Sequence, residues 1–240
     1  MSPKLRIKND PRNLLGSLVL VFPLLLIYQV GVLFTLPMLN GADFLTVFLF
    51  KNLGLTNAQY LAYTGIVAVL FAVAVGLLRR RQRFDPRMII PVFLESAIYA
   101  LTMGSLIIFV MTRLFGISPR LAGGGAVQDQ GLIARLVMSL GAGVYEETVF
   151  RLLLFGGLVA LGERVLGLGR WLAVIIGLGI SSLLFSAMHH IPPYGDPLRL
   201  GIFTFRVLAG VCFGLLFLFR GFAVAVYTHA LYDLYVLLVR

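Results

Sequence analysis

Two adjacent glutamates and an arginine interrupt a long apolar stretch in the segment GAGVYEETVFRLLL. A charged side chain at the centre of a bilayer costs about 3 kcal/mol on insertion scales, so it requires a partner, a polar cavity or a function. Glu147 and Arg151 are four residues apart on one helix face, which predicts an ion pair between them. Glu146 lies about 100° around an α-helix from Glu147. We therefore expect Glu146 to face a polar cavity; the alternative is that both carboxylates only join helices.

Histidines in two other apolar stretches complete the candidate set. His189 ends the run LLFSAMHHIPP, with Phe185 one helical turn before it. His229 lies in AVYTHALYDLYVLL, and Asp233 follows one turn later on the same face. A lone histidine in a membrane helix is often only a hydrogen-bonding group between helices. Two histidines, with carboxylates beside them on other segments, favour a shared site instead.

Four other ionisable residues at membrane depth stay outside the candidate site. Glu95 is expected to line the same cavity or to pair with Arg135 or Arg206. His190 follows His189 directly and therefore points elsewhere on the helix, so we expect it to face a loop or the interface.

The candidate set is suited to hydrolysis. Glu146 in a water-containing cavity is a candidate general base that activates water. His189, His229 and Asp233 are candidates for orienting the water or stabilising the oxyanion. The same three residues could instead bind a divalent metal such as zinc, because two imidazoles and a carboxylate resemble a catalytic zinc site. The spacing does not separate these two mechanisms, and it requires no other cofactor.

Other hydrolytic mechanisms have little support in the sequence. The single cysteine, Cys212, is not near a histidine, and no GxSxG elbow is present. Ser186 lies one turn from His189 on the same helix, a poor arrangement for a nucleophile and its base. No HExxH pair is present either, which excludes that class of zinc protease.

The composition shows what must hold these residues. The chain has 240 residues, of which 60% are hydrophobic, and a mean hydropathy of +0.97, which excludes a soluble domain. The continuous apolar runs do not alternate as barrel strands do. We predict an all-α fold, a polytopic transmembrane helical bundle with about seven spans. The runs long enough to cross a hydrocarbon core of about 30 Å are 14–36, 60–78, 88–110, 132–161, 171–188, 200–219 and 222–239.

A shorter apolar run at 44–55 is interrupted by Lys51. We interpret it as an interfacial or re-entrant segment, with an eighth span as the alternative.

Basic residues gather at the helix ends and give the chain a formal net charge of +10. They precede the first span and follow the second, which places the N-terminus in the cytoplasm by the positive-inside rule. The members of these two groups are Lys4, Arg6, Lys8, Arg12, Arg79, Arg80, Arg81, Arg83 and Arg87. A nucleic-acid partner would require a basic soluble face, which a chain of this kind does not offer. The expected partners are the lipid bilayer and a membrane protein or peptide substrate.

Three segments resemble the motifs of a known family. EETVFR at 146–151, FSAMH at 185–189 and HALYD at 229–233 are similar to the EExxxR, FxxxH and HxxxN/D motifs of the CAAX protease and bacteriocin-processing family of intramembrane endopeptidases, often called Abi. The resemblance begins at about residue 132. We therefore divide the chain into N-terminal membrane helices and loops, 1–130, and a catalytic core, 131–240.

The resemblance implies an all-helical membrane fold that cleaves peptide bonds near the membrane, with the site in a cavity open to water. It implies that Glu146 activates water and that Glu147 and Arg151 brace the motif. It also implies that three further residues orient the water and the oxyanion or bind a metal, namely His189, His229 and Asp233. Phe185 would pack beneath the site.

Two positions depart from the family pattern. Leu152 stands where the family frequently has glycine, and Asp233 stands where eukaryotic prenyl-protein processors usually have asparagine. The second difference favours a metal and disfavours a prenylated CAAX substrate. The short loops suit a bacterial member in the inner (cytoplasmic) membrane that trims peptides, a sorting-signal tail or a membrane protein. The alternatives are a proton-coupled transporter, although no internal repeat is visible, and a non-catalytic peptide-binding membrane protein.

Overall fold

The computed structural model describes residues 13–35, 40, 42–80, 84–118, 131–191 and 196–239, and every regular element in these ranges is a helix. The predicted all-α fold is confirmed. In chain order the elements are α1 (Leu14–Thr35), α2 (Phe44–Val47), η1 (Phe48–Asn52), α3 (Asn57–Leu78), η2 (Pro86–Met88), α4 (Ile89–Arg113), α6 (Leu132–Gly141), η3 (Ala142–Glu146), η4 (Thr148–Phe155), α7 (Gly156–Arg164), α8 (Arg170–Met188), α9 (Leu200–Arg220) and α10 (Phe222–Val239). The basic residues from Lys4 to Arg12, with Arg81 and Arg83, lie outside the described residues.

Each of the seven predicted spans coincides with a helix or a run of helices. Five helices are long and apolar enough to cross a membrane by length and composition: α1, α3, α4 with its leading turn η2, α8 and α9. The remaining two are α10, which is shorter, and the uninterrupted run from α6 through η3 and η4 to α7. The apolar run near Lys51 forms only α2 and η1, of four and five residues. Together these reach about 14 Å, so they do not form an eighth span.

Local sequence signals explain several helix ends. Thr56 and Gln59 form a capping box that starts α3. Asp85 accepts a hydrogen bond from the backbone of Arg87, and Pro86 follows it, where the missing N–H of proline costs nothing. At the other end, Gly221 has a φ of 92°, a conformation that other residues rarely adopt. This glycine allows α9 and α10 to form a tight antiparallel hairpin.

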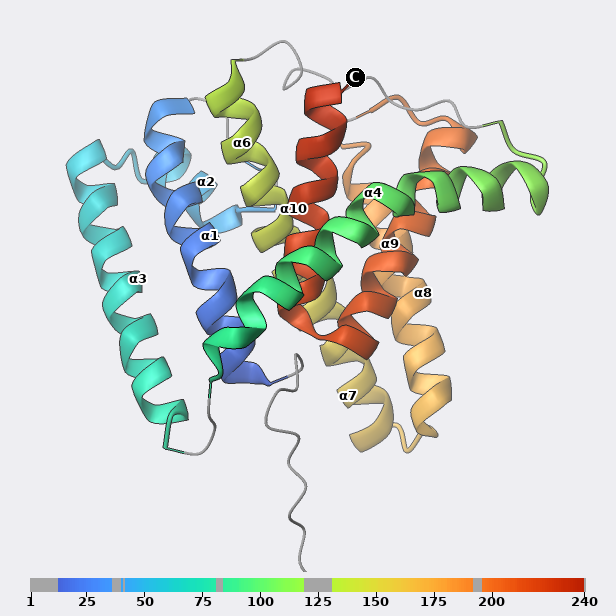
Figure 1. Ribbon diagram of the computed structural model, residues 1–240, viewed down its shortest axis with the longest axis horizontal. Coiled ribbons are helices and arrows are strands. Elements are labelled where there is room, and N and C mark those ends of the chain that lie inside the picture. Colours follow the sequence, from blue (N-terminus) through green and yellow to red (C-terminus); the bar gives the residue numbers. More distant parts are fainter. Residues whose placement is uncertain are drawn as a thin grey trace, which may run out of the picture.

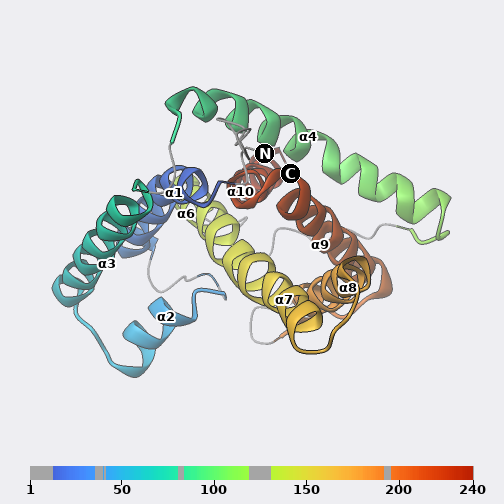
Figure 2. The same cartoon turned by 90° about the horizontal axis from the view of Figure 1, so that it is seen from below.

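The helices form a bundle with α10 near its middle. In Figure 1, α3 packs along α1 at one edge, and α4 crosses diagonally over α10 and α9. Figure 2 shows the run from α6 to α7 passing through the centre, with α1 and α3 on one side and α8 and α9 on the other. The first half of α10 is buried, and its fully buried residues are Ala223, Val224, Ala225, Val226 and Thr228. A helix packed on so many sides suits the positioning of functional groups.

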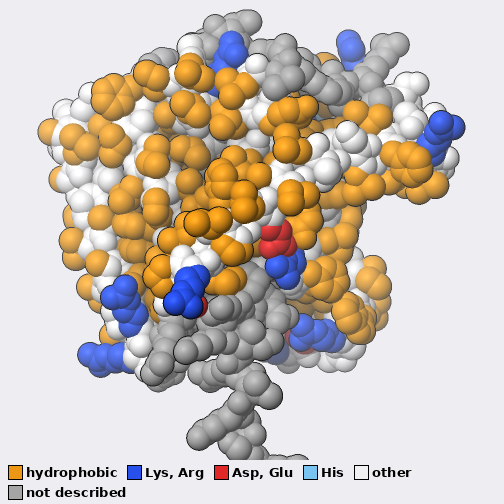
Figure 3. Space-filling model, in the orientation of Figure 1, with side chains coloured by type: hydrophobic (Ala, Val, Ile, Leu, Met, Phe, Trp, Pro, Cys, Tyr) orange, Lys and Arg blue, Asp and Glu red, His pale blue; other side chains and the backbone are white. Residues whose placement is uncertain are grey.

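The outer surface of the bundle is hydrophobic. Figure 3 shows a lateral face made mostly of apolar side chains, with most of its basic side chains near the two ends. Large apolar residues such as Leu70, Ile98 and Leu153 are exposed. A soluble monomer does not normally expose apolar surface of this extent, whereas a lipid-facing surface does. The chain is an integral membrane protein.

Candidate active site

The two glutamates lie in a stretch of helix that is not regularly α-helical. Residues Ala142–Glu146 and Thr148–Phe155 are π-helical, with i→i+5 hydrogen bonding. The sequence did not predict these π-helical segments. Isolated π turns are rare in helices and occur frequently at functional sites.

A close approach between η3 and α10 brings the glutamates beside His229. A Cβ atom added at Gly143 would lie 2.7 Å from the carbonyl oxygen of Val226 and 2.8 Å from the Cβ of Ala230. Only a glycine therefore allows these two helices to pack at this distance. Gly143 lies three and four residues before Glu146 and Glu147, and Ala230 is next to His229.

We expect Gly143→Ala to destabilise the protein by about 1–3 kcal/mol, because the new methyl group must push η3 away from the backbone of α10. Gly157→Ala in α7 is the matched control, since nothing lies within 4 Å of a Cβ added at Gly157. Unfolding by denaturant in detergent micelles measures both variants. A Gly143→Ala protein as stable as Gly157→Ala would show that the two helices do not need the glycine.

Glu147 joins Arg151 to His229. Its Oε1 atom lies 3.1 Å from Nη1 of Arg151 and 2.7 Å from Nδ1 of His229. The pair with Arg151 was expected from the spacing, and the contact with His229 was not. All three side chains are buried. Because Nδ1 of His229 is directed at Glu147, its Nε2 is left to face the rest of the site.

Glu146 faces both histidines. Its Oε2 atom lies 3.4 Å from Nε2 of His189 and 3.9 Å from Nε2 of His229, and its Oε1 accepts a hydrogen bond of 3.1 Å from Nδ2 of Asn40. Nε2 of His229 also lies 3.6 Å from Oδ2 of Asp233. The structure therefore brings the six candidate residues from three segments into one cluster.

Aromatic rings form the floor of this cluster. Phe185 lies against both histidines, with ring centroids 4.7 Å from His189 and 6.0 Å from His229. Phe213 stacks on His229 at 4.3 Å. The guanidinium of Arg151 lies over Phe185 at 4.3 Å and over Phe213 at 5.3 Å, within the range of cation–π attraction. His189 directs Nδ1 to the carbonyl oxygen of Phe185 at 2.7 Å, which leaves Nε2 toward Glu146.

A comparison with known protein families agrees with the three motifs EETVFR, FSAMH and HALYD. Residues 128–235 match the family model described as type II CAAX prenyl endopeptidase Rce1-like. This part, which is somewhat less than half of the chain, is similar to the Rce1-like family. The family indicates a membrane protease, and the resemblance read from the three motifs is confirmed. No curated protein and no solved structure matches the chain significantly.

Two residues that contact this cluster were missed in the sequence. Phe213 is one of 19 phenylalanines in an apolar chain, so nothing in the pattern marks it. Asn40 lies outside the matched range, between the first two apolar runs. Its only signal is that it is a polar residue at the end of a span.

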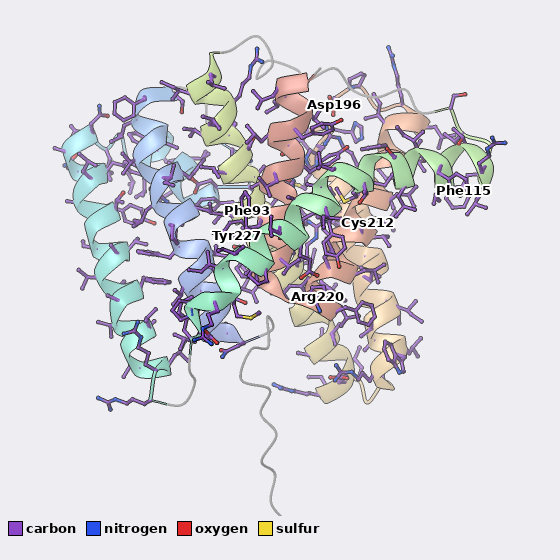
Figure 4. The ribbon with its side chains drawn as sticks, viewed as in Figure 1. Phe93, Phe115, Asp196, Cys212, Arg220 and Tyr227 are labelled. Atoms are coloured by element: carbon purple, nitrogen blue, oxygen red, sulfur yellow. The ribbon has the colours of Figure 1, made fainter. Side chains whose placement is uncertain are left out.

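The cluster is accessible from one end of the bundle. The side chains of His189 and Asp233 are 22% and 31% exposed, whereas those of Glu147 and His229 are buried. Next to His189, Asp196 donates its backbone N–H to the carbonyl oxygen of His189 at 2.8 Å and pairs with Arg206 through its carboxylate. Figure 4 places Asp196 near the end of the bundle at which α8 and α10 finish. The cluster opens toward that end.

The other ionisable residues have separate partners. Glu95 lies 2.7 Å from Nη2 of Arg220 and accepts a hydrogen bond of 2.9 Å from Tyr99, so the expected pairing with Arg135 or Arg206 was wrong. In Figure 4, Arg220 lies far from Asp196. Arg135 donates instead to the carbonyl oxygen of Leu237 at 2.9 Å. The ring of His190 stacks on Phe203, and its Nδ1 lies 2.9 Å from the carbonyl oxygen of Asp196.

The arrangement of the donor set also bears on metal binding. Within the described part of the chain, no group of three or more His, Cys, Asp or Glu side chains has the arrangement of a metal site. The metal site predicted from His189, His229 and Asp233 is therefore not found among these residues.

Proposed function

We propose that this chain is an intramembrane endopeptidase that hydrolyses peptide bonds of membrane-associated proteins or peptides, with Glu146 as the general base. One observation carries the proposal: the Oε2 atom of Glu146 faces Nε2 of both His189 and His229. A carboxylate beside two imidazoles, in a cluster with one accessible side, provides a base and two donors around one position.

The chemistry follows from the roles that these groups are able to take. Glu146 removes a proton from water while the water oxygen attacks the carbonyl carbon of the peptide bond. The imidazolium forms of His189 and His229 donate from Nε2 to the oxyanion that develops. The tetrahedral intermediate then collapses, the C–N bond breaks, and the proton held by Glu146 passes to the leaving nitrogen. Asp233, 3.6 Å from Nε2 of His229, stabilises the positive charge of that ring.

Glu147 and Arg151 act in this proposal through His229. The imidazole must present Nε2, not Nδ1, to the reacting atoms, and the 2.7 Å contact with Glu147 supports that orientation. The stacked ring of Phe213 restricts rotation of the same imidazole. Such positioning groups raise rates by keeping the reacting atoms in a productive geometry before the reaction begins.

The end of the bundle at which the site opens suggests the kind of substrate. α8 begins at Arg170 and ends at Met188, just before His189, so the site and the basic turn between α7 and α8 lie at opposite ends. If basic turns are cytoplasmic, the site of a protein in a bacterial inner membrane faces the outer side. That orientation favours a sorting-signal tail, a peptide or a membrane protein cleaved near the outer leaflet. A prenylated CAAX tail at the cytoplasmic surface fits it less well.

The experiment that tests the function is a comparison of membrane proteomes. Cells that produce the wild-type chain or the Glu146→Gln variant are compared by mass spectrometry of protein termini. We expect new termini only with the wild type, at positions close to the outer face of the inner membrane. Identical sets of termini would contradict the proposal, and cleavage positions on the cytoplasmic side would contradict the proposed orientation.

A further inference from the structure

Asn40 is the contact of Glu146 that comes from the N-terminal half of the chain. Its Nδ2 atom donates to Oε1 of Glu146 at 3.1 Å, across 106 positions of sequence. The two carboxylate oxygens of Glu146 therefore have different surroundings. Oε1 is bound by Asn40, while Oε2 faces His189 and His229.

Three backbone contacts fix Asn40 in place. Its Oδ1 accepts a hydrogen bond of 2.8 Å from the N–H of Ala42, and its carbonyl oxygen accepts one of 3.1 Å from the N–H of Asp43. Its own N–H donates to the hydroxyl oxygen of Tyr28 at 3.3 Å. Side chains of asparagine commonly stabilise turns by bonding to the backbone two residues later. Asn40 thus uses Oδ1 for the turn and Nδ2 for Glu146.

The turn is itself anchored to the helices around the site. Asp43 is fully buried and accepts a hydrogen bond of 3.0 Å from the N–H of Thr46, which starts α2. Tyr28 of α1 is also fully buried, and its ring lies 5.2 Å from the ring of Tyr145, the residue before Glu146. A Cβ at Gly141 would lie 2.2 Å from the ring of Tyr28, so this ring packs directly on α6.

We infer that Asn40 is a positioning residue for the reaction, which holds the carboxylate of Glu146 so that Oε2 is the oxygen presented to water. This inference rests on the proposed function of Glu146 as the base. The two oxygens of a carboxylate are equivalent, so what matters is the plane and the direction of the group. A donor that the Tyr28 and Asp43 contacts hold in place fixes one oxygen, and this keeps the other oxygen directed at His189 and His229. The N-terminal helices therefore contribute to the reaction itself and not only to the membrane anchor.

The test uses two substitutions at one position. Asn40→Asp keeps Oδ1 for the N–H of Ala42 and so keeps the turn, but it removes the donor and places a carboxylate against Glu146. Asn40→Ala removes both contacts. We expect kcat to fall about 10- to 100-fold in both, with KM within about twofold, because the base is displaced while the peptide still binds. The control is Asn52→Asp, an exposed asparagine at the end of η1.

A role limited to the turn predicts a different pattern, in which Asn40→Asp turns over like the wild type and only Asn40→Ala is impaired. That result would overturn the inference. It is distinguishable from failure of the proposed function, because Glu146→Gln measured in the same assay would then still be inactive. Full activity of Glu146→Gln would instead overturn the proposed function, and the positioning role with it.

The double variant Asn40→Asp/Glu146→Gln provides a readout that does not depend on activity. It exchanges the donor and the acceptor, since Gln at 146 donates to Asp at 40. We expect Asn40→Asp alone to lower Tm by about 4 °C or more through like-charge repulsion, and the second substitution to restore most of it. Failure of Glu146→Gln to restore Tm would mean that the two side chains are not in contact, and would overturn the inference.

Discussion

Glu146→Gln is expected to lower kcat for cleavage of a membrane-proximal peptide by about 10²- to 10⁴-fold, the usual contribution of a general base. Glutamine has nearly the same size and keeps an oxygen for the Nδ2 donor of Asn40, so the fold should survive. It cannot accept a proton from water at neutral pH. The measurement is turnover by purified protein in detergent or liposomes, with Tm recorded for the same samples.

Glu95→Gln is the matched control for this loss. Glu95 also lies within an apolar helix and has a cationic partner, Arg220, which lies far from Asp196 at the open end of the site (Figure 4). We expect its turnover to equal that of the wild type. Full turnover by Glu146→Gln, or equal losses in the two variants, would remove Glu146 from the role of base.

The cluster could be predicted from the sequence because its members are chemically costly where they stand. Charged and imidazole side chains in apolar runs need partners, so Glu146, His189 and His229 are conspicuous in the residue pattern alone. Their spacing within motifs also predicted the pair between Glu147 and Arg151, which forms at 3.1 Å. The helices themselves followed from the length of the apolar runs.

Other features depend on contacts between distant segments, which a single sequence does not report. The π-helical turns around Glu146 arise from packing, and no residue pattern marks them. The close approach of η3 to α10 depends on Gly143, one of 26 glycines in the chain. Asn40 reaches Glu146 only because α1 and the turn after it fold against α6. The pairing of Glu95 with Arg220 was missed for the same reason.

The second large effect concerns stability. Arg151→Met is expected to reduce the free energy of unfolding by about 3–5 kcal/mol, because it removes the arginine that pairs with the fully buried carboxylate of Glu147 and leaves His229 as the neighbour of that carboxylate. The cation–π contacts of the guanidinium with Phe185 and Phe213 are lost as well. Unfolding of the purified protein by denaturant in micelles gives the value.

Arg220→Met is the control for the loss of an arginine. Its ion pair with Glu95 is more exposed, with side chains 43% and 23% accessible, so its loss should cost about 1 kcal/mol or less. The double variant Glu147→Gln/Arg151→Met removes both buried charges and should recover most of the stability. It should remain much less active than the wild type, because a neutral amide holds the imidazolium of His229 more weakly than a carboxylate does. If the double variant recovers both stability and activity, Glu147 acts only as the ion-pair partner of Arg151. If it recovers stability without activity, Glu147 has a second role in positioning His229 that is distinct from its ion pair with Arg151.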